Sequence, residues 1–320
     1  MNDPSSHIMP ETKSGTKLGF IGLGNMGGRM VQRLIDAGYA PLLQDISPTT
    51  ARGFPDSGAS VAATPLEVAT EAEVVFCSLP TPDVVFDVCL GATGLDKGKA
   101  VKIIVDLSTT GRRMTERIAK VLREKGITFI DAPVSGGTVG AEQGALTIMA
   151  SGDRNGFDII LPLLRVLGRN IFYIGDRPGM GQSMKLVNNM LAATNALGAF
   201  ETLVVGVKSG LDPKVMLDVI NVSSGRNSAT LDKVPQCVLP RTFPMRFATG
   251  LLYKDIRLCV EEAEAAGALL WLGQTVKQIL AFAVAQGDAE KDYAAVVRHF
   301  ERWADVTVGT ANHQDGEATG

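Results

Sequence analysis

The chain has 320 residues, of which 45% are hydrophobic and 20% are charged, and its formal net charge is −3. This length suffices for two domains with substantial cores, and the hydrophobic content excludes a wholly disordered chain. The nearly balanced charge gives no electrostatic footprint for nucleic acid. The four cysteines form no CxxC pair, and two of the three histidines lie in polar terminal segments. These patterns argue against a disulfide framework and against a metal site.

The two ends of the chain have the composition of flexible segments. Residues 1–16 lack the apolar stretch of a secretory signal, and residues 306–320 are similarly polar. We interpret both as disordered. A membrane span needs roughly 20 mostly apolar residues, and four polar residues interrupt the most apolar stretch: Asn188, Asn189, Asn195 and Glu201. We therefore expect a cytoplasmic protein with no membrane or nucleic-acid partner.

The first half of the chain alternates short apolar segments with amphipathic ones. The predicted strands are residues 18–21, 41–44, 74–79, 103–107, 128–130, 146–150 and 171–173, and predicted helices include 25–37 and 114–125. Apolar strands that alternate with helices are typical of a parallel sheet covered on both faces. The predicted fold class for residues 17–176 is therefore α/β, with a doubly wound sheet.

After Gly175 the pattern becomes helical throughout. Residues 184–209 predict one long helix that is apolar on nearly all sides, which indicates burial. Asp212 and Pro213 predict the start of the helix 213–221. Further helices are predicted at residues 247–266, 269–285 and 293–303. We predict an all-α domain over residues 177–305, joined to the first domain by the long helix.

A glycine motif follows the first predicted strand. The residues are Gly22, Leu23, Gly24, Asn25, Met26 and Gly27, which fit GxGxxG between a strand and a helix. In a dinucleotide-binding turn the first glycine permits the tight turn, the second lets the backbone approach a pyrophosphate, and the third allows close helix packing. The helix N-terminus adds free N–H groups for the phosphates. Residues 17–176 therefore predict a Rossmann-type domain.

Three further segments lie where strand ends would meet the cofactor. Asp45 ends the second predicted strand, where a carboxylate binds a ribose hydroxyl and repels a 2′-phosphate. This position favours NAD over NADP, although Arg52 keeps NADP open and a turn-capping role for Asp45 is the alternative. Leu79 and Pro80 follow the third predicted strand, and Ser108 and Thr109 follow the fourth. Ordinary turns explain those two pairs equally well.

Two other groups of residues have the chemistry of a substrate site. Ser135, Gly136 and Gly137 offer successive backbone N–H groups that suit a carboxylate, or they form a simple glycine turn. Lys185 and Asn189 share one face of the long predicted helix among apolar neighbours. A desolvated lysine has a lowered pKa and can exchange a proton with an alcohol or carbonyl oxygen. A solvated lysine beside a polar interdomain contact is the alternative.

Four ordered motifs resemble the β-hydroxyacid dehydrogenase family, which includes 3-hydroxyisobutyrate dehydrogenases and tartronate semialdehyde reductases. They are GLGNMG, DAPVSGG with the following GAL, GMGQSMKLVNN and YKDIRL, and the resemblance extends from about Lys17 to Trp303. The family commonly continues the strand-end Ser-Thr pair with an aliphatic residue and a proline, where this chain has Thr110, Gly111 and Arg112. The segment SSGRNSATLDKVP also differs from the Gly-x-Ser-Trp pattern of many members.

The resemblance implies roles for the residues of these motifs. It implies that Lys185 is the catalytic lysine with Asn189 as its partner, and that Ser135, Gly136 and Gly137 hold a small carboxylate substrate. It places Gly22 to Gly27, Leu79, Pro80 and Thr109 around the cofactor, and it brings Lys254 to the active-site cleft. It also implies assembly as a homodimer or homotetramer.

We therefore expect NAD-dependent oxidation of a small β-hydroxy acid to its semialdehyde, or the reverse, with Lys185 as general acid/base. One alternative is an NADPH-dependent reductase of small aldehydes such as glyoxylate, succinic semialdehyde or tartronate semialdehyde. A second alternative is a non-catalytic dinucleotide-binding module. The sequence leaves the substrate open.

Overall fold

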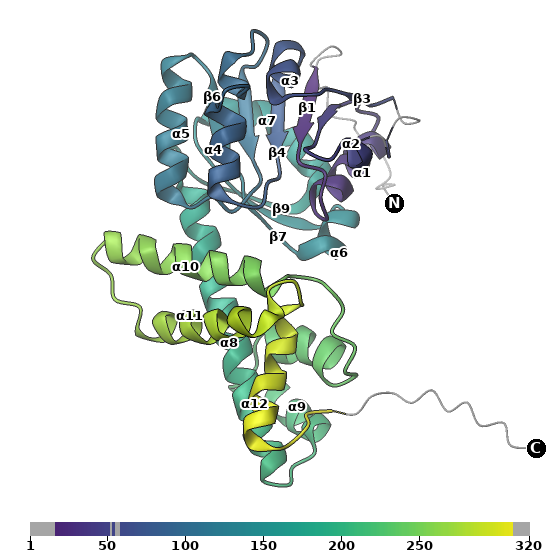
Figure 1. Cartoon of the computed structure of the whole chain (residues 1–320), viewed down its shortest axis with the longest axis vertical. Coiled ribbons are helices and arrows are strands. Elements are labelled where there is room, and N and C mark those ends of the chain that lie inside the picture. Colours follow the sequence, from purple (N-terminus) through teal and green to yellow (C-terminus); the bar gives the residue numbers. More distant parts are fainter. Residues whose placement is uncertain (1–16, 52, 55–57, 310–320) are drawn as a thin grey trace, which may run out of the picture. The chain divides into compact units, whose positions relative to one another are not determined.

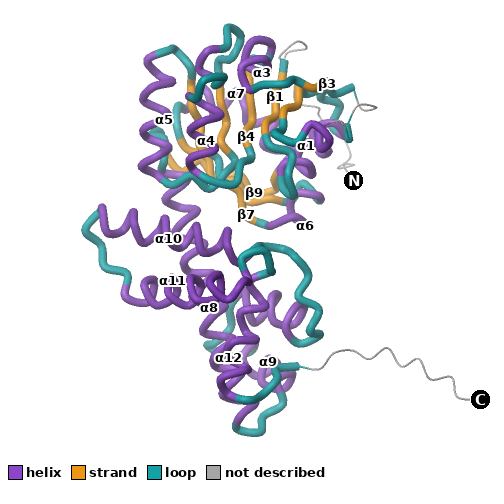
Figure 2. Tube along the Cα trace, in the orientation of Figure 1, coloured by secondary structure: helices purple, strands orange, loops and turns teal. Residues whose placement is uncertain are grey.

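The computed structural model describes residues 17–51, 53–54 and 58–309. The predicted leader 1–16, most of the predicted tail and Arg52 lie outside the described residues. The chain divides into two compact units, with the division after Lys185. The strands lie in the first unit, and the second unit is built from helices, as Figure 2 shows. Each unit is described by itself.

One sheet forms the centre of the first unit (Figure 1). Its strands are β1 (Leu18–Ile21), β2 (Leu42–Gln44), β3 (Ser60–Val61), β4 (Val74–Cys77), β5 (Ile103–Asp106), β6 (Thr128–Asp131), β7 (Val134–Ser135), β8 (Leu146–Ser151) and β9 (Gly168–Gly175). Every predicted strand is confirmed, with ends that shift by a few residues. The two-residue strands β3 and β7 are too short to give an apolar pattern, and the sequence did not predict them.

The strands lie in the order β3-β2-β1-β4-β5-β6-β8-β7, with β9 paired to β8. The pairs from β3 to β6 are parallel, which confirms the doubly wound α/β prediction. The prediction of a fully parallel sheet was wrong at the edge formed by β7 and β8, because β8 runs antiparallel to both β6 and β7. An apolar strand pattern does not encode the direction of pairing, so only the connections decide it.

Helices cover both faces of this sheet. They are α1 (Gly27–Asp36), α2 (Pro48–Ala51), α3 (Pro65–Glu71), α4 (Pro82–Leu90), η2 (Leu95–Lys97), α5 (Arg112–Glu124), α6 (Gly137–Glu142) and α7 (Arg154–Leu167). Alternate strand residues point to opposite faces. Phe20 and Phe76 pack with side chains of α1 and α7, whereas Ile21 and Val75 pack with those of α3, α4 and α5. Two apolar layers therefore enclose the sheet.

The long helix α8 (Met180–Lys208) begins in the first unit and continues into the second. It is long and apolar enough to cross a membrane by composition, but half of its most apolar window is buried inside the protein. Leu186, Leu197, Phe200 and Leu203 are buried in the core of the second unit. We interpret α8 as a core helix.

The other helices of the second unit complete this core. They are α9 (Pro213–Asn221), the π-helix η3 (Ala229–Val238), α10 (Thr249–Ala265), α11 (Trp271–Ala283), the π-helix η4 (Val284–Asp288), η5 (Tyr293–Val296) and α12 (Val297–Ala304). The Asp212 side chain caps α9 by accepting hydrogen bonds from the N–H groups of Lys214 and Val215, as predicted. The sequence did not predict η3, because Pro235 inside it interrupts an α-helical pattern.

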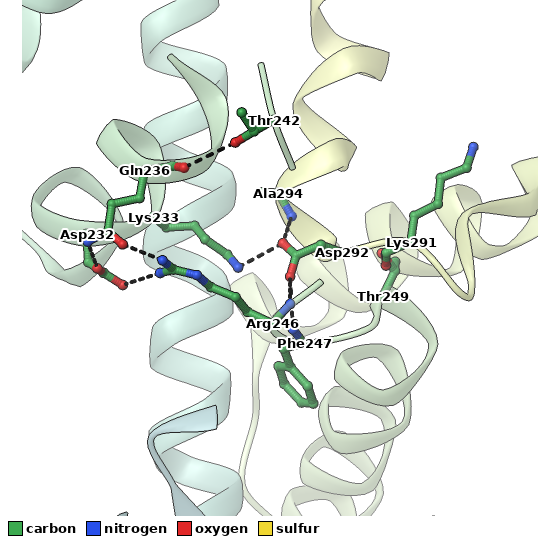
Figure 3. A network of polar contacts seen from close by, with 10 residues as sticks. All are labelled: Asp232, Lys233, Gln236, Thr242, Arg246, Phe247, Thr249, Lys291, Asp292 and Ala294. Atoms are coloured by element: carbon green, nitrogen blue, oxygen red, sulfur yellow. Dashed lines mark hydrogen bonds and ion pairs between the residues drawn. The ribbon is translucent and has the colours of Figure 1, made fainter. Parts of the chain in front are cut away.

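A buried ion pair fixes η3 to the start of η5 (Figure 3). Lys233 Nζ lies 2.8 Å from Asp292 Oδ1, and both side chains are almost fully buried. Asp292 also accepts hydrogen bonds from the backbone N–H groups of Arg246, Phe247 and Ala294. The Lys233 ammonium lies 4.2 Å from the ring centroid of Tyr293. The carboxylate therefore orders three separate segments of the second unit.

The packed part of the chain extends beyond the predicted end of the helical domain at residue 305. Val308 is fully buried, and its N–H donates to Glu301 Oε1 at 2.7 Å. Arg241 also pairs with Glu301. The prediction of a tail that starts at residue 306 was therefore wrong for residues 306–309, because two valines, Val306 and Val308, are too few to give a helical period.

Candidate active site

The predicted cofactor residues of the first unit lie at one edge of the sheet. The carboxyl ends of β1, β2, β4 and β5 are aligned there, because Ile21 pairs with Gln44 and Cys77, and Cys77 pairs with Asp106. The turns that follow are linked by hydrogen bonds. The Gly22 N–H donates to the Gln44 carbonyl, and the Leu79 N–H donates to Ser108 Oγ at 2.8 Å. Ligands of open α/β sheets bind at such an edge.

The glycine turn fits a dinucleotide phosphate. Gly22 has a φ of +90°, and a Cβ on Gly27 would lie 1.8 Å from the Gly22 carbonyl oxygen. The fold itself therefore requires both glycines. A Cβ on Gly24 would meet no atom within 4 Å, so packing within the protein does not explain this glycine. A ligand that approaches the backbone at Gly24 does, and α1 begins just beyond it at Gly27.

Asp45 is held at the end of β2 by two backbone groups. Its Oδ2 accepts from the Leu23 N–H at 2.7 Å, and its Oδ1 accepts from the Ser47 N–H at 2.8 Å. The turn-capping role that the sequence left open is thus present. It does not use up the carboxylate, because each oxygen has two acceptor positions. The Asp45 carboxylate therefore lies beside the glycine turn with further acceptor positions available.

The residues predicted to hold the carboxylate lie at the end of the short strand β7. Ser135 pairs with Thr147 of β8, and Gly136 and Gly137 have φ values of +129° and +62°. Residues other than glycine rarely adopt these backbone conformations. The turn therefore exposes backbone at this point, as the sequence predicted. Leu79 and Thr109 are half-buried and Pro80 is exposed, and all three belong to the aligned turns.

Lys185 lies in the second turn of α8 and is 8% exposed. This burial excludes the alternative of a solvated lysine. Gln182, three residues earlier on the same helix, is fully buried. Its side chain bonds to the turn that contains Thr109: Oε1 accepts from the Thr110 N–H at 2.9 Å, and Nε2 donates to the Ser108 carbonyl at 2.9 Å. The predicted lysine and the predicted cofactor turn are thus connected inside the first unit.

In the second unit Asp255 connects two predicted residues. Asn189 is 5% exposed, and its Nδ2 donates to Asp255 Oδ2 at 2.7 Å. Lys254 Nζ lies 3.2 Å from Asp255 Oδ1. This is not a solvated surface pair, because the Asp255 side chain is 3% and the Lys254 side chain 13% exposed. The Asn188 Nδ2 donates to Asn189 Oδ1, so the polar contacts run from Asn188 through Asn189 to Asp255 and Lys254.

A buried carboxylate at the end of β6 holds the start of α8. Asp131 accepts hydrogen bonds from the N–H groups of Gly179 and Gln182 and from the hydroxyl of Ser151. Burial raises the pKa of Asp131 to about 6, although these hydrogen bonds favour the charged form. The carboxylate of Asp106 on the neighbouring strand raises the pKa further.

Sequence reasoning missed Gln182, Asp131 and Asp255 as parts of this arrangement. Gln182 and Lys185 are three residues apart, so an extension of the lysine face by one helical turn finds the glutamine. Asp131 ends a buried strand, as Asp45 and Asp106 do nearby, and that position is a usable signal. The partners of Asp255 are up to 66 residues away in the sequence. No local pattern encodes that contact.

Comparisons with known proteins agree with this geometry. Residues 17–175 match the family model described as the NAD-binding domain of 6-phosphogluconate dehydrogenase. Residues 179–300 match the one described as NAD-binding of NADP-dependent 3-hydroxyisobutyrate dehydrogenase. Together the two matches cover both predicted domains.

Three similar proteins span nearly the same length. The mitochondrial 3-hydroxyisobutyrate dehydrogenase of Rattus norvegicus is 37% identical, over 89% of this chain and 87% of its own. The 2-(hydroxymethyl)glutarate dehydrogenase of Eubacterium barkeri is 37% identical, over 91% of this chain and 97% of its own. The solved structure of Mycobacterium tuberculosis 3-hydroxyisobutyrate dehydrogenase with L-serine has a TM-score of 0.81 and 31% identity, and covers 89% of this chain and 98% of that one. The chain therefore belongs to the 3-hydroxyisobutyrate dehydrogenase family, whose members are NAD(P)-dependent oxidoreductases that act on the CH–OH group of hydroxy acids.

Proposed function

We propose that this protein oxidises a small β-hydroxy acid to its semialdehyde with NAD, or catalyses the reverse reaction, with Lys185 as the general acid/base. The observation that carries the proposal is the buried Lys185 one turn from Gln182, whose amide bonds to the turn after β5. The two named dehydrogenases that are 37% identical over most of the chain act on acids of this class.

The proton and the hydride leave the alcohol separately. A nicotinamide cofactor held at the glycine turn would supply the acceptor for the hydride of the carbinol carbon. The electron pair of the hydroxyl O–H bond forms the carbonyl, and Lys185 Nζ takes up the proton. In the reverse direction Lys185 returns this proton to the oxygen. In the oxidation direction the amine must be neutral, because only that form accepts a proton.

The substrate carboxylate is held by the turn at Ser135, Gly136 and Gly137. The positive φ values at the two glycines present backbone N–H groups that suit an anion. Asn189 hydrogen-bonds the reacting oxygen or orients Lys185, and Asp255 fixes the Asn189 amide through its 2.7 Å contact. These residues orient the acid so that the alcohol carbon, and not the carboxylate, faces the cofactor.

NAD is the preferred cofactor in this proposal, because a 2′-phosphate beside Asp45 would meet a negative charge held in place by two N–H groups. The alternative is an NADPH-dependent reductase of small aldehydes. The description of the second matched family model, which names an NADP-dependent 3-hydroxyisobutyrate dehydrogenase, supports the cofactor of this alternative but not its substrate. Comparison of kcat/KM for NAD and NADP separates the two.

The test is a panel of small 3-hydroxy acids: 3-hydroxyisobutyrate, 3-hydroxypropionate, glycerate, serine and threonate. Each is assayed with NAD and with NADP by the absorbance of the reduced cofactor. We expect at least one acid to be oxidised, with NAD preferred. Tight NAD binding with no turnover of any acid in the panel, in either direction, would support the non-catalytic binding module instead.

A further inference from the structure

One amide side chain joins the turn after β5 to the first turns of α8. Gln182 Oε1 accepts from the N–H groups of Thr110 at 2.9 Å and Gly111 at 3.2 Å, and Nε2 donates to the Ser108 carbonyl at 2.9 Å. The side chain is fully buried. Both ends of the amide are therefore used on one short turn.

The backbone of Gln182 is fixed just as firmly to the sheet. Its N–H donates to Asp131 Oδ2 at 3.0 Å, and the Gly181 N–H donates to Ser151 Oγ at 2.8 Å. A Cβ on Gly181 would lie 2.2 Å from the Met149 carbonyl oxygen, so the helix lies directly on β8 at this point. The backbone of Gln182 is thus fixed to the sheet, while its side chain holds the turn after β5.

The turn and the helix carry the two groups whose separation matters. Thr109 lies between the residues that Gln182 holds, and Lys185 follows Gln182 by three residues. Thr110 also stands where the family commonly has an aliphatic residue, and its hydroxyl donates to Asp106 Oδ2 at 2.6 Å. The turn in this chain is thus held by polar contacts, with Gln182 as its link to α8.

We propose that Gln182 is a positioning residue that fixes the cofactor turn around Thr109 relative to the catalytic Lys185. This inference rests on the proposed function of those two residues. Hydride transfer depends steeply on the separation of the reacting groups, and a misplacement of about 1 Å costs roughly 10²-fold in rate. A side chain that sets this separation affects the reaction without touching the substrate.

Three variants separate positioning from packing. Gln182→Met has nearly the same length but makes none of the three hydrogen bonds. Gln182→Glu keeps the shape and, while its carboxyl is protonated, can still accept from Thr110 and donate to Ser108. Ser151→Ala is the matched control, because it removes buried hydrogen bonds from the same helical turn and leaves the Gln182 side chain in place.

The first measurement is amide hydrogen exchange in the cofactor-free protein, which does not depend on activity. In Gln182→Met we expect exchange at Thr110 and Gly111 to become at least about 5-fold faster, because each of these N–H groups loses its hydrogen-bond acceptor. In Ser151→Ala we expect these two amides to exchange at the wild-type rate. Unchanged exchange in Gln182→Met would overturn the proposed link.

The second measurement is kcat as a function of pH. Each kcat is divided by the fraction of folded protein, which circular dichroism measures. Charged groups near the site are Asp106, Asp131, Arg112 and Lys185, so the Gln182→Glu variant is compared with wild type at each pH to cancel their titrations. At low pH the ratio of kcat values should lie near one. It should fall about 10–100-fold as the introduced carboxyl group ionises, because a carboxylate cannot donate to the Ser108 carbonyl.

The outcomes distinguish this inference from the proposed function. A ratio that stays flat with pH, or Gln182→Met with a wild-type kcat, overturns the positioning role while dehydrogenase activity remains. No turnover by wild type overturns the proposed function, and hydrogen exchange then still decides whether Gln182 holds the turn. Faster exchange together with a falling ratio supports the positioning role.

Discussion

Asp45 and Leu23 are joined by a 2.7 Å hydrogen bond from the Leu23 N–H to Asp45 Oδ2. Leu23 belongs to the glycine turn after β1, and Asp45 directly follows β2. The residue that would discriminate between the two cofactors is therefore attached to the turn that would bind the phosphates. In the proposed site this bond would couple cofactor choice to the shape of the phosphate-binding turn.

Replacement of Asp45 by asparagine should change the cofactor preference. The amide keeps one acceptor for a backbone N–H and removes the negative charge that opposes a 2′-phosphate. We expect the ratio of kcat/KM for NADP to that for NAD to rise about 10–100-fold, or about 1.4–2.8 kcal/mol. Asp36→Asn on α1 is the control, because its exposed carboxylate bonds to Gln32. An unchanged ratio in Asp45→Asn would contradict the assigned role.

Loss of the Asp255 carboxylate should lower kcat. In Asp255→Ala the Asn189 Nδ2 loses its carboxylate acceptor, and the Lys254 ammonium loses its contact with the same carboxylate. We expect kcat to fall about 10–100-fold, since a misplaced catalytic amide costs rate, together with a lower Tm. Asp218→Ala, which removes an exposed carboxylate of α9, should leave both unchanged. A folded Asp255→Ala variant with wild-type kcat would show that Asn189 needs no fixed orientation.

Asp131 should make stability depend on pH in the acid range. Its pKa is raised from 3.8 to about 6, so the folded protein binds this proton more tightly than the unfolded chain. The contribution is therefore fully present below pH 3.8 and is lost as the pH rises through about 6. Between pH 4 and 7 wild type should lose on the order of 3 kcal/mol relative to Asp131→Asn.

Urea unfolding of both proteins across this pH range measures the difference. A difference that does not change with pH would show that the hydrogen bonds from Gly179, Gln182 and Ser151 balance the effect of burial on the pKa. Wild type that gains stability relative to Asp131→Asn as the pH rises would show that they outweigh it.

The ion pair of Lys233 and Asp292 predicts unequal effects for its two members. Asp292→Ala leaves a buried ammonium and three backbone N–H groups without their acceptor, and should cost about 3–5 kcal/mol. Lys233→Met leaves those three hydrogen bonds in place and should cost less. Urea midpoints of the two variants and of the double variant measure this difference. Equal losses in the two single variants would mean that the backbone contacts of Asp292 contribute little.

Local patterns predicted most of the fold. The alternation of apolar strands with helices placed β1, β4 and β5 correctly, because each of these strands is buried along its whole length and is almost entirely apolar. The antiparallel direction of β8 and the π-helix η3 were not predictable, because pairing direction and a proline-containing helix depend on contacts distant in the sequence.

The same limit applies to the candidate site. The glycine turn, Asp45 and the face of Lys185 follow from spacing alone. The contact between Gln182 and Thr110 joins residues 72 positions apart, and that between Asn189 and Asp255 joins residues 66 positions apart. Motifs therefore predicted the groups that we propose to react, whereas the groups that hold them in place became apparent only in the structure.

The most direct test of the whole account is the turnover of Lys185→Ala with the best acid of the panel and NAD. We expect kcat to fall by a factor on the order of 10²–10⁴, because no other proposed group accepts the hydroxyl proton. The dissociation constant for NADH should stay close to that of wild type, and Lys208→Ala, at the exposed end of the same helix, should keep full activity. A near-normal kcat in folded Lys185→Ala would contradict the central claim.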